Sequence, residues 1–265
     1  MDNLLLTLII IMLEVHQIPV LVDNYIYLVH EPVSGVTAVV DPAVSDIVLR
    51  ELEQKHWQLD YIFNTHHHAD HVGGNLSLKK ASGCKIIGAK SDHARIPGID
   101  VGLSEGEKFK LGNESANIFE VDGHTLGHIA FWFESAQILF CGDTLFAMGC
   151  GRLFEGSPAQ MWEALQKLRQ LPSNTTVYCT HEYTEANGRF ALSVEPGNTK
   201  LQTRMRRVQA LRQQNKPTIP FQIREELTTN PFLRADQANL KLALGMETHT
   251  GLEVFTELRH RKNNF

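Results

Sequence analysis

The feature that most restricts this chain is a short histidine-rich segment, THHHADH at residues 65–71. It follows the apolar run YIF at residues 61–63, which is typical of a buried strand. Imidazole and carboxylate groups are ligands for zinc, iron or manganese, and they need no cysteine beside them. A lone histidine more often lies on a surface or in a core, but four histidines and an aspartate within six residues predict a metal site.

Short runs rich in valine, isoleucine, phenylalanine and tyrosine occupy the first 180 residues, separated by glycine, proline, aspartate and asparagine. This pattern predicts strands rather than long helices. The predicted strands are Glu14–Ile18, Asn24–Val29, Thr37–Val40, Asp60–Phe63, Lys85–Gly88, Asn117–Glu120, Ile129–Phe133, Gln137–Cys141 and Thr175–Thr180.

Helical patterns interrupt the strands and then replace them. Ser45–Lys55 and Pro158–Leu171 are predicted helices, the second with Ser157 as its N-cap. After about His181 only helices follow, and strands with interspersed helices before a purely helical segment indicate an α/β domain with a helical appendage. Within this appendage the predicted helices are Thr199–Asn215, with Arg204, Arg206 and Arg207 as a solvated basic face, Thr218–Leu227, and further helices from Arg234 to the end.

Length and charge narrow the classes of function. A chain of 265 residues accommodates one large domain or one large and one small domain. The net charge of −5 argues against a nucleic-acid partner. Four cysteines without a CxxC pair favour reduced, buried thiols in a cytoplasmic protein. The apolar run at residues 4–13 is too short to span a bilayer and lacks the features of a signal peptide, so residues 1–11 are interpreted as an N-terminal extension.

The histidine-rich segment resembles the HxHxDH signature of the metallo-β-lactamase superfamily. Three later segments are similar to the other ligand loops of that family: GHTLGH at residues 123–128, FCGDT at residues 140–144 and THEY at residues 180–183. Leu126 stands where the family usually has proline, and Thr180 stands where it usually has glycine. The resemblance implies a four-layer αββα sandwich and the following metal ligands: His66, His68, Asp70, His71, His124, Asp143 and His181.

The same resemblance implies two divalent metals at the edge of the sandwich. His66, His68 and His124 would hold one metal, Asp70, His71 and His181 the other, and Asp143 would bridge them. His67 is the variable position of the signature and is expected to point away. His128 either orients a ligand or serves the loop alone.

Such a pair of metals lowers the pKa of a shared water and polarises a carbonyl group, which suits hydrolysis. Asp70 and Asp143 are the expected catalytic carboxylates, with Asp70 placed to accept a proton from the water. The chain has no GxSxG segment, so a serine nucleophile of the α/β-hydrolase kind is excluded. The sequence does not choose between zinc, iron and manganese, although zinc is the expected metal.

Three segments resemble the glyoxalase II family within this superfamily. They are LFAMGCGRLFEG at residues 145–156, HEYTEANGRFALSVEPGN at residues 181–198 and RHRKNNF at residues 259–265. The resemblance covers about residues 12–265. Glutathione carries two carboxylates, which arginine and lysine bind through charge-assisted hydrogen bonds. The residues implied to contact the substrate are Arg152, Phe154, where many members have tyrosine, Tyr183, Arg259 and Lys262.

The resemblance therefore implies a catalytic domain at residues 12–181 and a helical glutathione-binding domain at residues 182–265. The implied activity is hydrolysis of S-D-lactoylglutathione to glutathione and D-lactate, the second step of methylglyoxal detoxification, by a cytoplasmic monomer with no nucleic-acid or membrane partner. The alternatives are a mononuclear iron persulfide dioxygenase and another hydrolase of this fold, such as a lactonase. Metal content and oxygen uptake would separate hydrolysis from dioxygenation.

Overall fold

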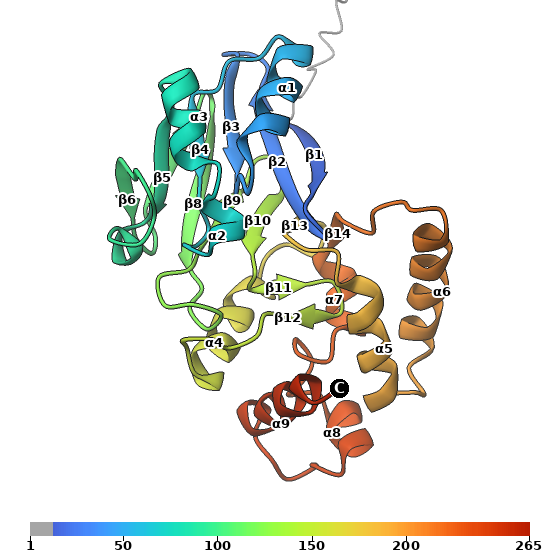
Figure 1. Ribbon diagram of the computed structural model, residues 1–265. Helices are drawn as coiled ribbons and strands as arrows, with labels where there is room; N and C mark the ends of the chain where they lie inside the picture. The colour runs from blue at the N-terminus through green and yellow to red at the C-terminus, as the bar shows by residue number, and fades with distance from the viewer. Residues whose placement is uncertain (1–12) are drawn as a thin grey trace, which may run out of the picture.

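The structure is a computed structural model that describes residues 13–265. The expected N-terminal extension lies outside the described residues. Two six-stranded sheets face each other, with helices on their outer sides (Figure 1). All nine strands expected from the sequence are present, most of them within two residues of the predicted ends.

The first sheet has the order β1-β2-β3-β4-β5-β6. Its first three strands run antiparallel, whereas β3, β4, β5 and β6 run parallel to one another. The parallel strands therefore end at one common edge. The bounds of the six strands are Glu14–Val20, Asn24–Glu31, Val36–Val40, Tyr61–Phe63, Lys85–Ala89 and Val101–Leu103.

The second sheet has the order β14-β13-β10-β9-β8-β7, and β10 and β13 run parallel while the other neighbours run antiparallel. A short hairpin of two further strands, β11 and β12, follows β10. The strands from β7 to β14 span Lys108–Leu111, Glu114–Glu120, Ile129–Phe133, Ile138–Gly142, Leu145–Phe146, Gly149–Cys150, Thr176–Cys179 and Phe221–Gln222.

Aromatic side chains fill the space between the two sheets. Phe63 of the first sheet stacks on Phe131 of the second, with ring centroids 4.8 Å apart, and Tyr27 lies 5.6 Å from Phe140. All four side chains are fully buried. Burying a side chain of this size contributes roughly 1.5–3 kcal/mol, so this layer is a major source of stability.

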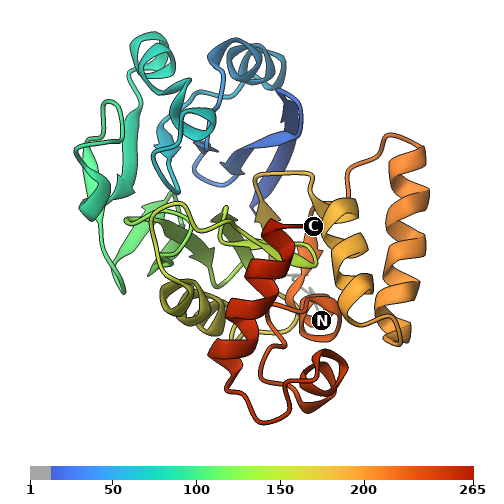
Figure 2. The same cartoon turned by 60° about the horizontal axis from the view of Figure 1, so that its bottom comes forward.

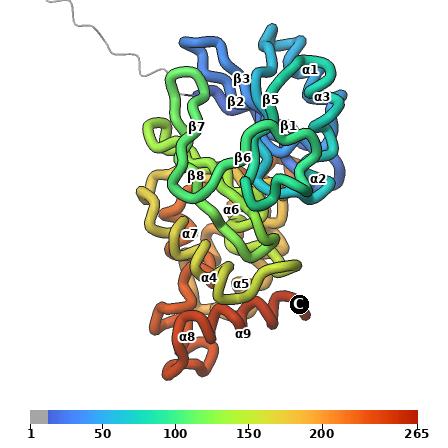
Figure 3. The backbone as a smooth tube through the Cα atoms, turned by 90° about the vertical axis from the view of Figure 1, so that its left-hand side faces the viewer, coloured from blue at the N-terminus to red at the C-terminus, as the bar shows by residue number. Residues whose placement is uncertain are grey.

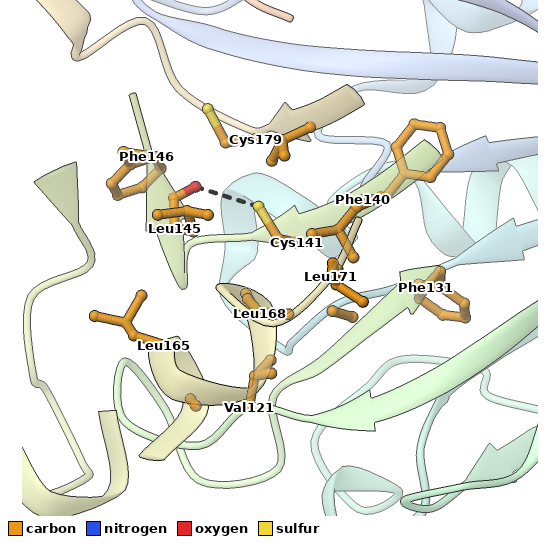
Figure 4. Close-up of a cluster of buried hydrophobic side chains, with 14 of the residues drawn as sticks. Val121, Phe131, Phe140, Cys141, Leu145, Phe146, Leu165, Leu168, Leu171 and Cys179 are labelled. Atoms are coloured by element: carbon orange, nitrogen blue, oxygen red, sulfur yellow. Dashed lines mark hydrogen bonds between the residues drawn. The ribbon is translucent and has the colours of Figure 1, made fainter. Parts of the chain in front are cut away.

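Helices cover the outer faces of both sheets. Val48 of α1 (Ser45–Lys55) and Leu78 of α3 (Asn75–Ser82) pack on the first sheet. On the second sheet, Leu165 and Leu168 of α4 (Pro158–Leu168) lie against Cys141 of β10 (Figure 4). The αββα sandwich expected from the resemblance is confirmed.

The sequence features proposed for α4 are present at its first turn. Ser157 caps the helix by accepting from the backbone N–H of Gln160, and the two residues form a capping box. Pro158 occupies the first turn, where a missing N–H costs nothing. The helix ends at Leu168, three residues before the predicted end.

Two of the C-terminal helices, α8 and α9, lie at the end of the molecule opposite α1 and α3 (Figure 3). The last of them, α9, packs beside α4 of the sandwich (Figure 2). A short α2 (Ala69–Val72) and a 3-10 turn (Lys90–Asp92) complete the described helices. The C-terminal helices α5 to α9 span Thr184–Val194, Thr199–Gln213, Ile223–Thr229, Ala238–Leu244 and Gly251–Asn263.

Two expectations for this helical segment are wrong. The predicted helix Thr218–Leu227 begins only at Ile223, because Phe221 and Gln222 pair with β13 as strand β14. Pro220 has no N–H for a helix and disfavours helical backbone in the residue before it. Arg204 is not on a solvated face: it is 6% exposed and forms an ion pair with Glu226.

All four cysteines are buried and carry free thiols. Cys141 donates its thiol hydrogen to the carbonyl of Leu145 at 3.2 Å (Figure 4), and Cys179 lies 3.7 Å from the carbonyl of His181. Among residues 13–265, no helix is both long enough and apolar enough to cross a membrane.

Candidate metal centre

The seven candidate ligands meet at one edge of the sandwich, although they come from four separate parts of the chain. His66 and His68 follow β4, and Asp70 and His71 lie on the short helix α2. His124 stands in the loop before β9, Asp143 directly follows β10, and His181 follows β13 after one residue.

One group of donor atoms comes from three histidines. The Nδ1 atom of His68 lies 3.0 Å from Nε2 of His66 and 3.1 Å from Nε2 of His124. The three nitrogens converge on one point and form a possible metal site. His66 is fully buried and His124 nearly so, which leaves access to this point from the side of His68.

A second group combines two histidines, His71 and His181, with the carboxylate of Asp70. Asp70 places Oδ2 3.6 Å from Nε2 of His71 and 3.5 Å from Nε2 of His181. Asp143 lies between the two groups, with Oδ2 3.4 Å from Nε2 of both His124 and His181. A carboxylate in this position can reach a metal in either group.

The residues present fit a metal ion. Nε2 of His71 is buried and has no hydrogen-bond partner among the described residues, although an unpaired buried nitrogen is costly. It faces Asp70 and Asp143 at 3.6 and 3.7 Å. A divalent cation held by imidazole and carboxylate would satisfy this nitrogen and neutralise the two carboxylates.

Charge complementarity shifts the pKa values in this cluster. Burial opposes ionisation of Asp143, yet the imidazoles of His181 and His71 hold its pKa well below the usual range. Burial alone would lower the pKa of His181, but Asp143, Asp23 and Asp70 raise it to about 9. Burial dominates in the group of three histidines: it lowers the pKa values of His66, His68 and His124, which favours the neutral imidazole that binds metals.

Outer hydrogen bonds fix which nitrogen of each histidine faces inward. Nδ1 of His71 lies 3.1 Å from Asp41, and Nδ1 of His181 lies 2.8 Å from Asp23. Nδ1 of His124 lies 2.8 Å from the carbonyl of Arg152. Each contact leaves Nε2 free to face the centre, as acceptors behind metal-binding histidines commonly do.

Sequence reasoning missed three of these supporting residues. Asp41 follows the parallel strand β3 and accepts from both the backbone N–H and the hydroxyl of Thr65. Asn24 donates to Oδ2 of Asp70 at 3.0 Å, and Asp23 precedes it in the β1–β2 turn. Asp41 could have been predicted, because it is a polar residue at the end of a parallel strand. No local sequence pattern in the β1–β2 turn indicates that Asp23 and Asn24 contact the candidate ligands.

The two remaining histidines of the motifs, His67 and His128, contact residues in or around the group of candidate ligands. The ring of His67 turns to Asp92, with Nδ1 3.0 Å from its carboxylate, and lies outside the donor groups. His128 is fully buried, stacks on His66 at 4.7 Å and accepts from the backbone N–H of Asp143 at 3.2 Å. His128 therefore helps to orient the loop that carries Asp143.

The departures from the family pattern are accommodated by new contacts. The backbone N–H of Leu126, which a proline would lack, donates to Glu155 at 2.8 Å. Thr180 donates its hydroxyl hydrogen to Asp143. Phe154 is 64% exposed and stands edge-on to His68 and His124, with ring centroids 5.7 and 5.1 Å away.

A cavity of about 520 Å³ opens on this cluster and has three basic residues in its wall. Arg152 lies on the exposed loop after β12, and Lys262 lies near the end of α9. Burial and the neighbouring guanidinium groups lower the pKa of Lys262 to about 8. Tyr183 also lines the cavity, and its ring stacks on His181 with centroids 4.7 Å apart.

The guanidinium group of Arg259 is less available for binding a ligand than the sequence suggested. It is 4% exposed, and its Nη1 donates to the carbonyl of Cys150 at 3.0 Å. Its Nε donates to Asn263 at 3.0 Å, and its guanidinium group lies over the ring of Phe232. None of the described residues accepts from Nη2, so this nitrogen is the part of Arg259 that can meet a ligand in the cavity.

Comparison with known proteins agrees with the geometry. Residues 20–181 match the model of the metallo-beta-lactamase superfamily, and residues 182–265 match that of the hydroxyacylglutathione hydrolase C-terminus. The hydroxyacylglutathione hydrolase of Methylococcus capsulatus is 58% identical over 96% of this chain and 99% of its own length. The hydroxyacylglutathione hydrolase of Rhodospirillum rubrum is 50% identical, again over 96% of this chain and 99% of its own length.

The chain belongs to the hydroxyacylglutathione hydrolase family. The glyoxalase II resemblance drawn from its motifs is thereby confirmed.

Solved structures show the same fold for this member of the hydroxyacylglutathione hydrolase family. The crystal structure of ETHE1 from Myxococcus xanthus matches with a TM-score of 0.68 and 21% identity, covering 94% of this chain and 91% of its own. The B3 metallo-beta-lactamase BLEG-1 matches with a TM-score of 0.63 and 18% identity, covering 83% of this chain and 99% of its own.

Proposed function

We propose that this chain is a binuclear metal-dependent thioesterase that hydrolyses S-D-lactoylglutathione to glutathione and D-lactate. The observation that carries the proposal is one cavity that joins the seven-residue ligand cluster to three basic side chains. The cluster suits attack on a carbonyl, and the basic residues suit a substrate with carboxylates. The family relatives are named for this substrate class.

His66, His68 and His124 are proposed to hold one metal, Asp70, His71 and His181 the other, and Asp143 to bridge them. When bound, two such metals lower the pKa of a shared water and polarise the carbonyl group of the thioester. The remaining steps are assigned to the chain itself. The carboxylate of Asp70 is half-buried and accepts a hydrogen bond from Asn24, so one of its oxygens is oriented to take a proton from the attacking water.

Recognition of the tripeptide is assigned to the cavity wall. Arg152, Lys262 and the free Nη2 of Arg259 would bind the glutathione carboxylates, and the three residues line the same cavity. Tyr183 and Phe154 would contact the substrate from the rim, where both rings are exposed to solvent. Phe154 offers no hydroxyl group, so its contribution is apolar packing alone.

Several finer features belong to the same proposal. The metals are proposed to be zinc, with iron or manganese able to use the same imidazole and carboxylate ligands. Residues 12–181 are proposed as the catalytic domain and residues 182–265 as the glutathione-binding domain. The protein is proposed to act as a cytoplasmic monomer on a small molecule, without a nucleic-acid or membrane partner.

The test is to load purified protein with metal, measure its metal content, and follow thiol release and oxygen uptake with S-D-lactoylglutathione. The expected result is about two metals per chain and chelator-sensitive thiol release without oxygen uptake. Asp143→Ala should lose metal and activity together, whereas Asp46→Ala, an exposed aspartate on α1, should lose neither. One metal per chain with oxygen uptake would instead support a dioxygenase.

A further inference from the structure

The tip of the β11–β12 hairpin is embedded in the C-terminal helical segment. The side chain of Met148 is fully buried in a cluster with Ala191 of α5 and Met205 of α6. Its backbone has a positive φ of 56°, an uncommon conformation for a residue with a side chain. A residue held in this conformation indicates that its surroundings fix it.

Three buried polar side chains of the C-terminal segment bind one backbone group of each residue from 146 to 149 in this hairpin. Asn230 donates to the carbonyls of Phe146 and Gly149 at 3.2 and 2.9 Å, and Asn187 donates to that of Ala147 at 3.2 Å. In the fourth hydrogen bond, the carboxyl group of Glu226 accepts from the backbone N–H of Met148 at 2.8 Å.

The acceptor at the centre of this set is the fully buried carboxyl group of Glu226. Glu226 forms an ion pair with Arg204 of α6 at 2.5 Å, and it also accepts from Asn230 at 2.9 Å. A buried charge of this kind is tolerated only where it is paired and hydrogen-bonded. Arg204 in turn donates to Thr229 at 2.6 Å, so helices α6 and α7 are joined at the same point.

The hairpin connects this buried pair to the cavity. Phe146 lines the cavity and contacts the rings of His181 and Tyr183, with centroids 6.0 and 5.3 Å away. At the other end of the hairpin, the carbonyl of Cys150 accepts from Nη1 of Arg259 at 3.0 Å. The position of the hairpin therefore sets both an aromatic wall and the orientation of a basic group in the cavity.

We propose that Glu226 is a positioning residue that holds the β11–β12 hairpin and thereby orients Arg259 for the tripeptide part of the substrate. This inference rests on the proposed function. Glu226 itself lines no part of the cavity, so it acts through the hairpin. Loss of its bond to Met148 should weaken binding of the glutathione portion and leave the metal cluster intact.

The test compares two double variants that both remove the buried ion pair. Arg204→Met with Glu226→Gln keeps an acceptor for the Met148 N–H, whereas Arg204→Met with Glu226→Leu removes it. The first should keep KM for S-D-lactoylglutathione within about twofold of the native value, because a paired buried charge can be replaced without loss. The second should raise it about tenfold, because a buried donor is left unsatisfied and the hairpin shifts.

Further measurements separate positioning from simple loss of stability. The Leu variant should keep its metal content and its rate on a lactoyl thioester of a small thiol, which does not use Arg259. Glu225→Gln, on the same helix but paired with Arg207 at the surface, should change nothing. If the Leu variant does not fold, Glu226→Asp, which withdraws the carboxylate from Met148, should raise KM in the same direction.

Equal KM values for the two double variants would overturn the positioning role, as would an unchanged KM in Glu226→Asp. Failure of the native protein to cleave either thioester would count against the proposed function instead. In that case hydrogen exchange across residues 145–150 still tests the hairpin. Faster exchange in the Leu variant than in the Gln variant is expected, and equal exchange would overturn the role of Glu226.

Discussion

Thr180 donates its hydroxyl hydrogen to Asp143, the carboxylate that lies between the two groups of candidate ligands. Thr180 occupies a position where the family usually has glycine, so this bond is an added support for the carboxylate. Thr180→Val keeps the shape of the side chain and removes the bond. Because outer hydrogen bonds typically contribute 10- to 100-fold to metal affinity, we expect metal to bind about tenfold more weakly.

Competition with a chelator measures this change. Thr176→Val, at the start of the preceding strand β13 and outside the groups of candidate ligands, is the matched control and should bind metal normally. An unchanged affinity in Thr180→Val would show that the hydroxyl contributes nothing to the site.

Arg259→Ala should raise KM for S-D-lactoylglutathione without changing metal content. The guanidinium group is held at the cavity wall by the carbonyl of Cys150, and Arg259 supplies none of the candidate metal ligands. Hydrogen bonds to charged groups contribute about 1.5–3 kcal/mol, which corresponds to an increase of about 10- to 100-fold. Steady-state kinetics on Arg259→Ala and on Arg261→Ala, which removes an exposed arginine paired with Glu257 on the same helix, test this directly. Identical kinetics for the two variants would make the proposed glutathione site wrong.

Lys262 should impose a pH limit on substrate binding. Burial and the neighbouring charges of Arg259, Arg189 and Arg152 lower its pKa to about 8. The ammonium group is therefore charged below that pH and loses its charge as the pH rises through it. We expect kcat/KM for the glutathione thioester to fall above about pH 8, since this ratio reports ionisation in the free enzyme.

A pH profile of Lys262→Arg supplies the comparison, because arginine stays charged throughout this range. The decline above pH 8 should disappear in that variant or move to higher pH. A decline of the same size and midpoint in both proteins would assign it to another group.

Removal of metal should destabilise the fold. Without a cation, Nε2 of His71 remains buried and unpaired beside the carboxylates of Asp70 and Asp143. A ligand present at about 100 times its Kd stabilises the native state by about 2.7 kcal/mol, which for a chain of this size corresponds to roughly 5–10 °C in Tm. Thermal melts of chelated and reloaded protein measure the difference. Asp143→Ala should show almost no dependence on added metal, and a native Tm independent of metal would contradict the assignment of the cluster.

Much of the sandwich was predictable because its strands are apolar runs bounded by turn-forming residues. The prediction failed where pairing depends on distant partners. Phe221 and Gln222 form a strand only because β13 lies beside them, and local helical pattern predicted the wrong structure there. Short strands such as β6 and β7 were missed for the same reason, since Val101–Leu103 and Lys108–Leu111 contain too few residues for a clear alternation.

The candidate ligands could be predicted because each stands in a motif close to the end of a strand. Two of their supports, Asp23 and Asn24, could not be predicted, because they lie many residues before His181 and Asp70, the residues that they contact. Arg204 shows the same limit: on sequence it looks like part of a basic surface, and only the approach of α7 buries it against Glu226. Side chains that act through contacts between remote segments leave little local pattern.

The most direct test of the central claim compares two substrates of one protein: S-D-lactoylglutathione and a lactoyl thioester of a small thiol without the tripeptide. We predict fast, chelator-sensitive cleavage of the first and a much lower kcat/KM for the second, because Arg152, Arg259 and Lys262 line the same cavity as the metal ligands. Equal kcat/KM values for the two thioesters, or no cleavage of either by metal-loaded protein, would contradict the account.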